Sequence, residues 1–527
     1  MGPRLPRSHR ARFGEQFEVT FTKLTNADHR DKTYRALAFS IWLAFIVLCA
    51  GTSVSTGLSY FDDAEMALVA RSLAHGSGYS IAREADIKET SQFQPGISAG
   101  PTLIVPCAFF LKLLGTKEVI PGLTALLIWA TILTFLILRV SRHISGPSFL
   151  LGVVFFLVAL LAMFAWQFGA WYAFLGEAAA AALLLFGHWI LAMEKLSWSW
   201  LSLSGLCLGL ALQTKYLAVL GMLGTAVILL LRWRYSQDEP KLSLGKATIW
   251  LSACLSPTVV FELWKLMELG SYSYCANWAA FLTLAKSQGL SSGNHAVLDL
   301  LRERIAILEE NFLINVPAFL LFFLAGLGLG TMRIRGNWTW FFLGLFVSFL
   351  SLGVYWIFFS IGLPRYLVIA MALACFAMSI PIFAFLKLRF ALLFLALSAV
   401  VFPDGIRRIP ATVTRAADHG LFKATEERHA RKKIVAAIRS LHDQEPMVVG
   451  TVQRAEAYAV EFDLDKAVKF QRVDSLGNLP GKKIVLINRL LGIPNQHAYI
   501  EDALHGPISS TILSAGPYEL LTVDGTP

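Results

Sequence analysis

Long apolar runs recur through the first three quarters of this chain, and they restrict its fold more than any other feature. A helix needs about 20 apolar residues to span the ~30 Å hydrocarbon layer of a membrane. Hydrophobic residues make up 56% of the chain and charged residues 16%, against about 25% charged residues in soluble proteins. The runs lie at 37–58, 119–140, 149–166, 171–193, 200–213, 216–231, 247–267, 312–329, 338–360, 366–385 and 390–402. The sequence therefore predicts a mainly α, polytopic helical membrane protein.

Short basic links between the runs predict the topology. The segments "SRH" at 141, "RWR" at 232, "RIR" at 333 and "KLR" at 387 should be cytoplasmic, because basic residues collect on that side. The run at 119–140 then passes inward, so the shorter run at 101–114 should not cross and fits a juxtamembrane or re-entrant helix. About eleven spans result, or about twelve or thirteen if 101–114 does cross. We expect a multi-pass protein of the cell inner membrane with a cytoplasmic N-terminus.

Three regions differ in composition. Residues 1–36 are polar and basic and should be cytoplasmic, whereas residues 37–402 form the membrane domain, with an extracytoplasmic loop at 59–100. Residues 403–527 have the composition of a soluble domain. Strand patterns ("PMVVGTV", "AVKFQRV", "KKIVLINR", "YELLTVDG") alternate there with helical patterns ("KATEERHARKKIVAAIRSLH", "RAEAYAVEF", "AYIEDALHG"). This alternation predicts a small α/β domain, which the topology places outside the cytoplasm.

The basic excess does not indicate nucleic-acid binding. The formal net charge is +10, but the basic residues collect in the links, where topology alone explains them. The six cysteines are scattered, mostly within apolar runs, and no pair has the spacing of a metal site. We therefore expect membrane lipid, and not nucleic acid, among the partners.

The loop after the first run begins with a concentration of acid, "YFDDAEMALVARSLAHGSGYS" at 60–80. Apolar residues recur there at helical spacing, so an amphipathic helix should begin near Ala64 and end before Gly76. Asp62 and Asp63 suit the N-cap and the dipole of such a helix. Three carboxylates within four residues nevertheless exceed what a cap requires. Capping and catalysis both stay open from the residues alone.

Other motifs follow this loop in a distinctive order. The helix ends in "HGSGY" and "GISAGPTLIVPCAFFLKLLG" follows; "GLCLGLALQTKYLAVL" surrounds Lys215 and "LPRYLVIAMALA" contains Arg365 and Tyr366. Together with the acidic pair, this ordered set resembles the C-type glycosyltransferase superfamily, and within it the aminoarabinose transferase and protein mannosyltransferase branches. The likeness covers about residues 37–402 in order and topology.

The resemblance implies an enzyme that transfers a sugar from a polyprenyl-phosphate donor to an envelope glycan, lipid or protein on the extracytoplasmic face. In such inverting transfer a base takes the proton of the acceptor hydroxyl, and the resemblance maps that role onto Asp62. Asp63 and Glu177, a lone carboxylate in an apolar run, would be supporting acids. The lipid phosphate that leaves needs cations, and the candidates for binding it are Lys88, Lys215, Arg365 and Tyr366.

Each of these residues also has a structural explanation. Glu177 and Lys215 can reach the membrane interface with their side chains, and Arg365 with Tyr366 can form an interfacial anchor. The segment "FQPG" at 93–96 departs from the family's Glu-Lys-Pro motif, which places a bound divalent metal in doubt and leaves the cofactor unknown. A transporter or lipid flippase is the rival class, although the chain lacks an inverted repeat. A catalytically dead relative is a second rival.

Overall fold

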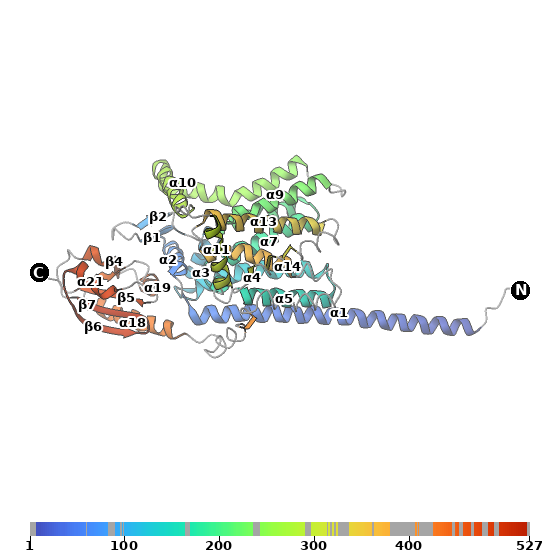
Figure 1. The fold of residues 1–527 in the computed structure, drawn as a ribbon, viewed down its shortest axis with the longest axis horizontal. Helices are drawn as coiled ribbons and strands as arrows, with labels where there is room; N and C mark the ends of the chain where they lie inside the picture. Colours follow the sequence, from blue (N-terminus) through green and yellow to red (C-terminus); the bar gives the residue numbers. More distant parts are fainter. Residues whose placement is uncertain are drawn as a thin grey trace.

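A single helix, α1 (Arg7–Thr56), runs along the whole bundle and projects beyond one end of it (Figure 1). The computed structural model of the chain describes residues 7–58, 61–82, 90–94, 97, 100–163, 169–235, 243–289, 297–312, 315–316, 319–320, 323–324, 337–360, 363–379, 406–407, 409, 425–444, 448–452, 457–464, 468–476, 483–489 and 495–523. The region expected at 1–36 and the first span therefore form one continuous helix from Arg7 onward. The C-terminal domain lies at the opposite end of the bundle.

Most of the described helices are apolar, as expected for a membrane protein. Within the described residues, five are long and apolar enough to cross a membrane: 30–56 of α1, α4 (Ile120–Ser141), α9 (Ala218–Tyr235), α10 (Leu244–Gly289) and α13 (Asn337–Phe359). Shorter apolar helices are α3 (Pro101–Leu114), α5 (Gly146–Met163), α7 (Glu177–Met193), α8 (Trp198–Thr214) and α14 (Val368–Met378). The expected runs at 312–329 and 390–402 lie largely or wholly outside the described residues. The predicted polytopic helical class is confirmed.

Contacts between α1 and α4 define the two ends of the bundle. At one end, Arg35 of α1 donates hydrogen bonds to the carbonyls of Ser141, the last residue of α4, and of Ile144. At the other end, Arg431 donates both to the carbonyl of Leu58 and to Glu118, which precedes α4. The chain thus leaves α1 and enters α4 at the same end, so α3, which lies between them, cannot make a single crossing on its own. The 14-residue length of α3 agrees, since at 1.5 Å per residue it reaches only about 21 Å.

The helix α10 is longer than its apolar run. We expected a span over 247–267, but α10 continues to Gly289 after a sharp turn at Gly270, whose φ is 70°. A left-handed backbone at this position is open to glycine without a steric penalty. The second half of α10 continues past the end of the bundle that faces the C-terminal domain (Figure 1).

The C-terminal domain is the predicted α/β unit. Its sheet has the order β4-β3-β5-β7-β6, with β3 parallel to both β4 and β5 and with β7 antiparallel to β5 and β6. The strands are β3 (Val448–Thr451), β4 (Lys469–Arg472), β5 (Lys483–Asn488), β6 (Ile508–Ala515) and β7 (Tyr518–Val523). The helices α18 (Glu426–His442) and α19 (Tyr458–Asp463) pack on one face, and α20 (Val473–Leu476) with α21 (Gln496–Leu504) on the other.

Candidate active site

The acidic residues of the first loop lie in the first turn of a helix. The helix α2 (Phe61–Ala74) begins three residues before the expected start at Ala64, so Asp62 and Asp63 are inside it. Negative charge in the first turn offsets the helix dipole, so both aspartates do stabilise the start of α2. Asp62, however, also forms an ion pair with Arg365, 303 residues later in the chain. Asp63 is buried, with 1% of its surface exposed.

Arg365 comes from a tight turn after α13. The turn is the 3₁₀ helix η1 (Pro364–Leu367), in which Pro364 fixes the first residue and the indole of Trp356 donates to the carbonyl of Leu363. The guanidinium of Arg365 also lies over the ring of Tyr366, 5.6 Å from its centroid. The proposed Arg-Tyr motif and the proposed base are therefore neighbours in space.

Glu177 and Lys215 form a second, more deeply buried pair. The two charged atoms, Glu177 Oε1 and Lys215 Nζ, are 3.0 Å apart, and both side chains are more than nine-tenths buried. The other carboxylate oxygen of Glu177 has no hydrogen-bond partner among the described residues. A buried carboxylate with one such oxygen can accept a hydrogen bond from a ligand hydroxyl.

The apolar run at 171–193 predicted a continuous helix around Glu177. The structure has a break there instead. The chain forms a short helix α6 (Gly169–Tyr172), turns, and begins α7 at Glu177. Gly176 makes this break with a φ of 88°, and its Cα lies so close to Leu103 and Lys215 that a Cβ would crowd both. A carboxylate at the first position of a helix is favoured by the helix dipole. The sequence did not indicate the break between α6 and α7, because the residues on both sides of it are apolar and buried.

The residue before α3, Gly100, packs against the chain next to Lys215. The amide of Gly100 donates to the carbonyl of Thr214, 3.1 Å away, next to Lys215. A Cβ at Gly100 would overlap the carbonyl oxygen of Gln213, so only glycine allows this approach. The motifs that resemble the glycosyltransferase superfamily, distant in sequence, therefore converge at the end of the bundle that faces the C-terminal domain.

The described residues offer no donor set for a divalent metal. No three His, Cys, Asp or Glu side chains gather anywhere in the described ranges. Asp62 faces Arg365 and Glu177 faces Lys215, so these two candidate acids each have a cation as a charged neighbour. This arrangement does not fit a metal bridged by carboxylates, and no chemical step below uses one. Lys88 lies outside the described residues.

The sequence interpretation missed a buried cation on α10. Lys265 lines a small cavity together with Tyr216, Gly100 and Trp278, directly beside the Lys215 corner. Its ammonium lies 5.0 Å from the Trp278 ring and 3.7 Å from Glu262. The lysine carried no separate signal in the sequence.

An apolar groove of about 970 Å³ adjoins the site. Its walls come from the last turn of α2, from α3, and from the facing sides of α8 and α10, where Leu210, Val260 and Trp264 lie. Gln213, two residues before Lys215, also lines it. The groove therefore leads from an apolar surface toward the buried ion pair, a shape that suits a molecule with a long hydrocarbon tail and a charged head.

Solved structures with a similar fold are known. The chain is similar to ArnT, an aminoarabinose transferase, from Cupriavidus metallidurans. The structure of ArnT bound to undecaprenyl phosphate matches with a TM-score of 0.56 and 14% identity, over 92% of this chain and 97% of that one. The structure of ArnT in the apo state matches with a TM-score of 0.57 and 13% identity, over the same shares. The expected C-type glycosyltransferase fold is thus confirmed. No protein-family profile matches the chain, and no curated protein does.

Proposed function

We propose that this chain is a membrane glycosyltransferase that moves a sugar from a polyprenyl-phosphate donor to an acceptor in the cell envelope, with inversion. Two observations in an ArnT-like bundle carry the proposal: the ion pair of Asp62 with Arg365, and the apolar groove that reaches Gln213, two residues before Lys215. Asp62 takes the proton of the acceptor hydroxyl as its oxygen attacks the anomeric carbon. The bond from that carbon to the phosphate oxygen breaks, and polyprenyl phosphate leaves.

The leaving phosphate requires positive charge. Arg365 can hold a phosphate with two parallel hydrogen bonds, and Tyr366 lies against its guanidinium. Lys215 supplies a second cation, and Lys265 is a third at the same corner. We keep Lys88 in this group as well. Preorganised cations in a site with little water stabilise the charge that develops on the leaving oxygen, which is the main electrostatic contribution expected here.

The supporting acids have different positions. Glu177 holds Lys215 in place and keeps one carboxylate oxygen for a sugar or acceptor hydroxyl. Asp63 is buried, so we assign it to the support of α2 and of the acidic turn rather than to direct acceptor contact. The departure at "FQPG" and the cations beside Asp62 and Glu177 argue for a mechanism without a bound metal.

The donor tail fits the apolar groove. Its walls are almost entirely hydrocarbon, and the neighbouring ArnT structure was solved with undecaprenyl phosphate bound, which supports the same ligand class here. We further propose that the site and the domain at 403–527 face the extracytoplasmic side of the inner membrane, with residues 1–36 in the cytoplasm. The C-terminal domain would then help to select a glycan, lipid or protein acceptor.

Transfer by the purified protein tests this function. The protein in detergent is incubated with a panel of radiolabelled polyprenyl-phosphate sugars and an envelope extract, and labelled product is separated from donor. We expect one donor to be consumed and its sugar to appear on an envelope component. A flux measurement in proteoliposomes, run on the same preparation, covers the transporter or flippase class. Movement of labelled lipid across the bilayer with no new glycosidic product would overturn the proposal.

A further inference from the structure

A buried arginine lies on the helix next to the turn that carries Arg365. This helix, α11 (Val297–Phe312), packs against α13 and η1, and its inner side carries Arg304, Leu308 and Phe312. These three positions are four residues apart, so they form one stripe along the helix. Apolar side chains normally fill a stripe that packs on a core. Arg304 is only 3% exposed there, so its presence needs an explanation.

The charge of Arg304 is poorly compensated. Among the described residues its ion-pair partner is Glu303, its neighbour in the chain, at 3.6 Å and with a side chain that is 55% exposed. The Nε and Nη1 groups of Arg304 have no hydrogen-bond partner in the part of the chain that the structure describes. A buried guanidinium with unmade hydrogen bonds lowers stability, and a hydrophobic side chain of similar volume often replaces a buried charge without loss. The stability of the fold therefore does not account for an arginine at this position.

The contacts that Arg304 does make hold the chain that leads into η1. Its Nη2 donates to the carbonyl of Ser360 at 3.0 Å, and its guanidinium lies over the ring of Trp356, 5.4 Å from the centroid. The indole of Trp356 in turn donates to the carbonyl of Leu363 at 2.9 Å. Ser360 directly follows α13 and Leu363 directly precedes η1. Arg304 thus holds both ends of the link that leads to Arg365, one end directly and the other through Trp356.

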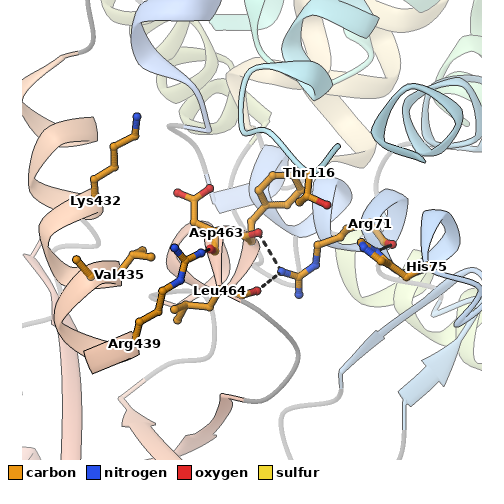
Figure 2. A pocket seen from close by; sticks show the side chains of 10 residues that line it. Arg71, His75, Thr116, Lys432, Val435, Arg439, Asp463 and Leu464 are labelled. Atoms are coloured by element: carbon orange, nitrogen blue, oxygen red, sulfur yellow. Dashed lines mark hydrogen bonds between the residues drawn. The ribbon is translucent and has the colours of Figure 1, made fainter. Parts of the chain in front are cut away.

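The partner of Arg365 is fixed independently of this link. Asp62 lies in the first turn of α2, and Arg71, in the last turn of α2, joins this helix to the C-terminal domain. Figure 2 shows Arg71 facing the end of α19, where its guanidinium donates to the carbonyls of Phe462 and Leu464 at 2.9 and 2.8 Å. The position of Asp62 is therefore set by α2, whereas the position of Arg365 is set by η1 and by the link before it.

We propose that Arg304 is a positioning residue, which holds the link before η1 so that Arg365 stays beside Asp62 and can bind the donor phosphate. The inference rests on the proposed function for the role of Arg365, whereas the positioning itself does not. Arginine binds phosphate through two parallel N–H groups, so a small displacement of its guanidinium loses this geometry. The arginine on the apolar stripe of α11 then serves the site and not the stability of the fold.

Binding of undecaprenyl phosphate by the purified full-length protein tests this role. Arg304→Met places an unbranched apolar side chain in the stripe, so the variant should unfold at the wild-type temperature or above, while its affinity should fall by about tenfold. The control is Arg302→Met, the same change at a 78% exposed side chain of α11, which should bind as the wild type does. Arg304→Met/Arg365→Met should bind no more weakly than Arg365→Met, because Arg304 acts through Arg365.

Amide hydrogen exchange measures the positioning without any ligand. The amide of Tyr366 donates to the carbonyl of Leu363 at 3.1 Å, within η1. It should exchange faster in Arg304→Met than in the wild type, because η1 is held less firmly. Trp356→Phe keeps a ring but loses the hydrogen bond to Leu363, so it should have the same effect. Arg302→Met should leave this exchange rate unchanged.

Three results would overturn the proposal. The first is an unchanged exchange rate of the Tyr366 amide in Arg304→Met. The second is a wild type that binds undecaprenyl phosphate no more tightly than a folded Arg304→Met does. The third is a double variant in which the two losses of affinity add, since Arg304 would then act apart from Arg365. Faster exchange in η1, combined with a wild type that binds no undecaprenyl phosphate, would support the positioning and contradict the proposed donor instead.

Discussion

Gly176 shows how one residue positions a charged side chain within an apolar region. Its left-handed backbone directly precedes α7, so that Glu177 starts this helix instead of continuing a span. The carboxylate then meets Lys215, which itself lies between α8 and α9 in an extended conformation. Two breaks in the helical backbone therefore create one buried ion pair. Buried pairs of this kind are costly to form, and breaking one by removing a single partner is costlier still.

The Glu177–Lys215 pair gives the first prediction. Lys215→Met leaves the Glu177 charge buried without a partner and should destabilise the protein by about 3–5 kcal/mol. The double variant Glu177→Gln/Lys215→Met removes both charges and should regain most of that stability. Sugar transfer should be lost in both, because the cation for the phosphate is missing. Thermal unfolding and transfer are measured side by side.

Two results would contradict this account of the pair. A double variant as unstable as Lys215→Met alone would mean that the two side chains are not energetically coupled. A stable double variant that still transfers sugar would mean that Lys215 serves only the fold. The stability measurement thus separates a structural lysine from one that acts on the donor.

At the scale of elements, α19 connects the two parts of the protein. Its apolar side packs on the C-terminal sheet through Val460, whereas Phe462 packs against the core of the membrane domain. Asp463, at its end, lies 3.6 Å from Arg431 and close to Glu118. Burial and Glu118 raise the pKa of this carboxyl to about 6, so the folded state holds its proton up to a higher pH than the unfolded chain does.

This shift predicts a stability that falls as the pH rises from about 4 to about 6, the window between the unfolded and folded pKa values of Asp463. Asp463→Asn has no charge to bury, so it should be more stable than the wild type at pH 8 by on the order of 2 kcal/mol, and equal to it near pH 4. The matched control is Asp443→Asn on the exposed end of α18. A wild type that is the more stable of the two at pH 8 would show that Arg431 outweighs the burial.

Elements with a strong pattern were predictable from the sequence. The four strand patterns of the C-terminal region became β3, β4, β5 and β7, because their alternating or continuous apolar residues are buried on the sheet. The strand β6, "ISSTILSA", was missed because it is a largely exposed edge strand, paired with β7 in the sheet of the described residues. The exact start of α2 was missed for another reason: Phe61 lies outside the apolar periodicity that defined the helix.

The site was predictable only in part. The motifs supplied the residues Asp62, Glu177, Lys215 and Arg365, and two ion pairs join them in the structure. Which acid meets which cation depends on contacts between helices more than 30 residues apart, and no local pattern records these contacts. Lys265 was overlooked for the same reason, since its role follows from the approach of α10 to Tyr216.

At the scale of the whole molecule, Glu118 holds the C-terminal domain against the bundle. It accepts from Arg428 and Arg431 of α18, and these arginines also donate to the carbonyls of Val54 and Leu58 at the end of α1. Burial opposes the charge of Glu118, but Arg431 and Arg428 outweigh it and lower the pKa of this carboxyl below its ordinary value. The carboxylate is therefore a charged centre between the two parts.

Loss of this centre should loosen the junction. Glu118→Gln leaves Arg431 buried without its carboxylate, at a cost of about 3–5 kcal/mol, so α18 and α19 should exchange their amide hydrogens faster. The helices at the opposite end of the bundle should keep their exchange rates. Glu303→Gln, an exposed position on α11 (Val297–Phe312), is the control. Equal protection of α18 in Glu118→Gln and in the wild type would mean that the apolar contacts alone hold the domain.

The arrangement of the whole chain brings a lipid groove, a carboxylate–arginine pair and an adjoining α/β domain to one end of a helical bundle. In the proposed reaction the donor tail stays between the helices while its sugar meets the acceptor beside Asp62. The proposed reaction depends on the side chain of Asp62. Asp62 either takes the acceptor proton or only offsets a helix dipole and holds Arg365.

The rate of sugar transfer by Asp62→Asn, relative to the wild type, tests that claim most directly. Asparagine keeps the size of the side chain but cannot accept the proton, so transfer should fall by about 10²–10⁴-fold while binding of undecaprenyl phosphate persists. Asp443→Asn, on the exposed end of α18, should transfer at the wild-type rate. Transfer by a correctly folded Asp62→Asn at the rate of the wild type would contradict the account and leave Asp62 a structural residue at the start of α2.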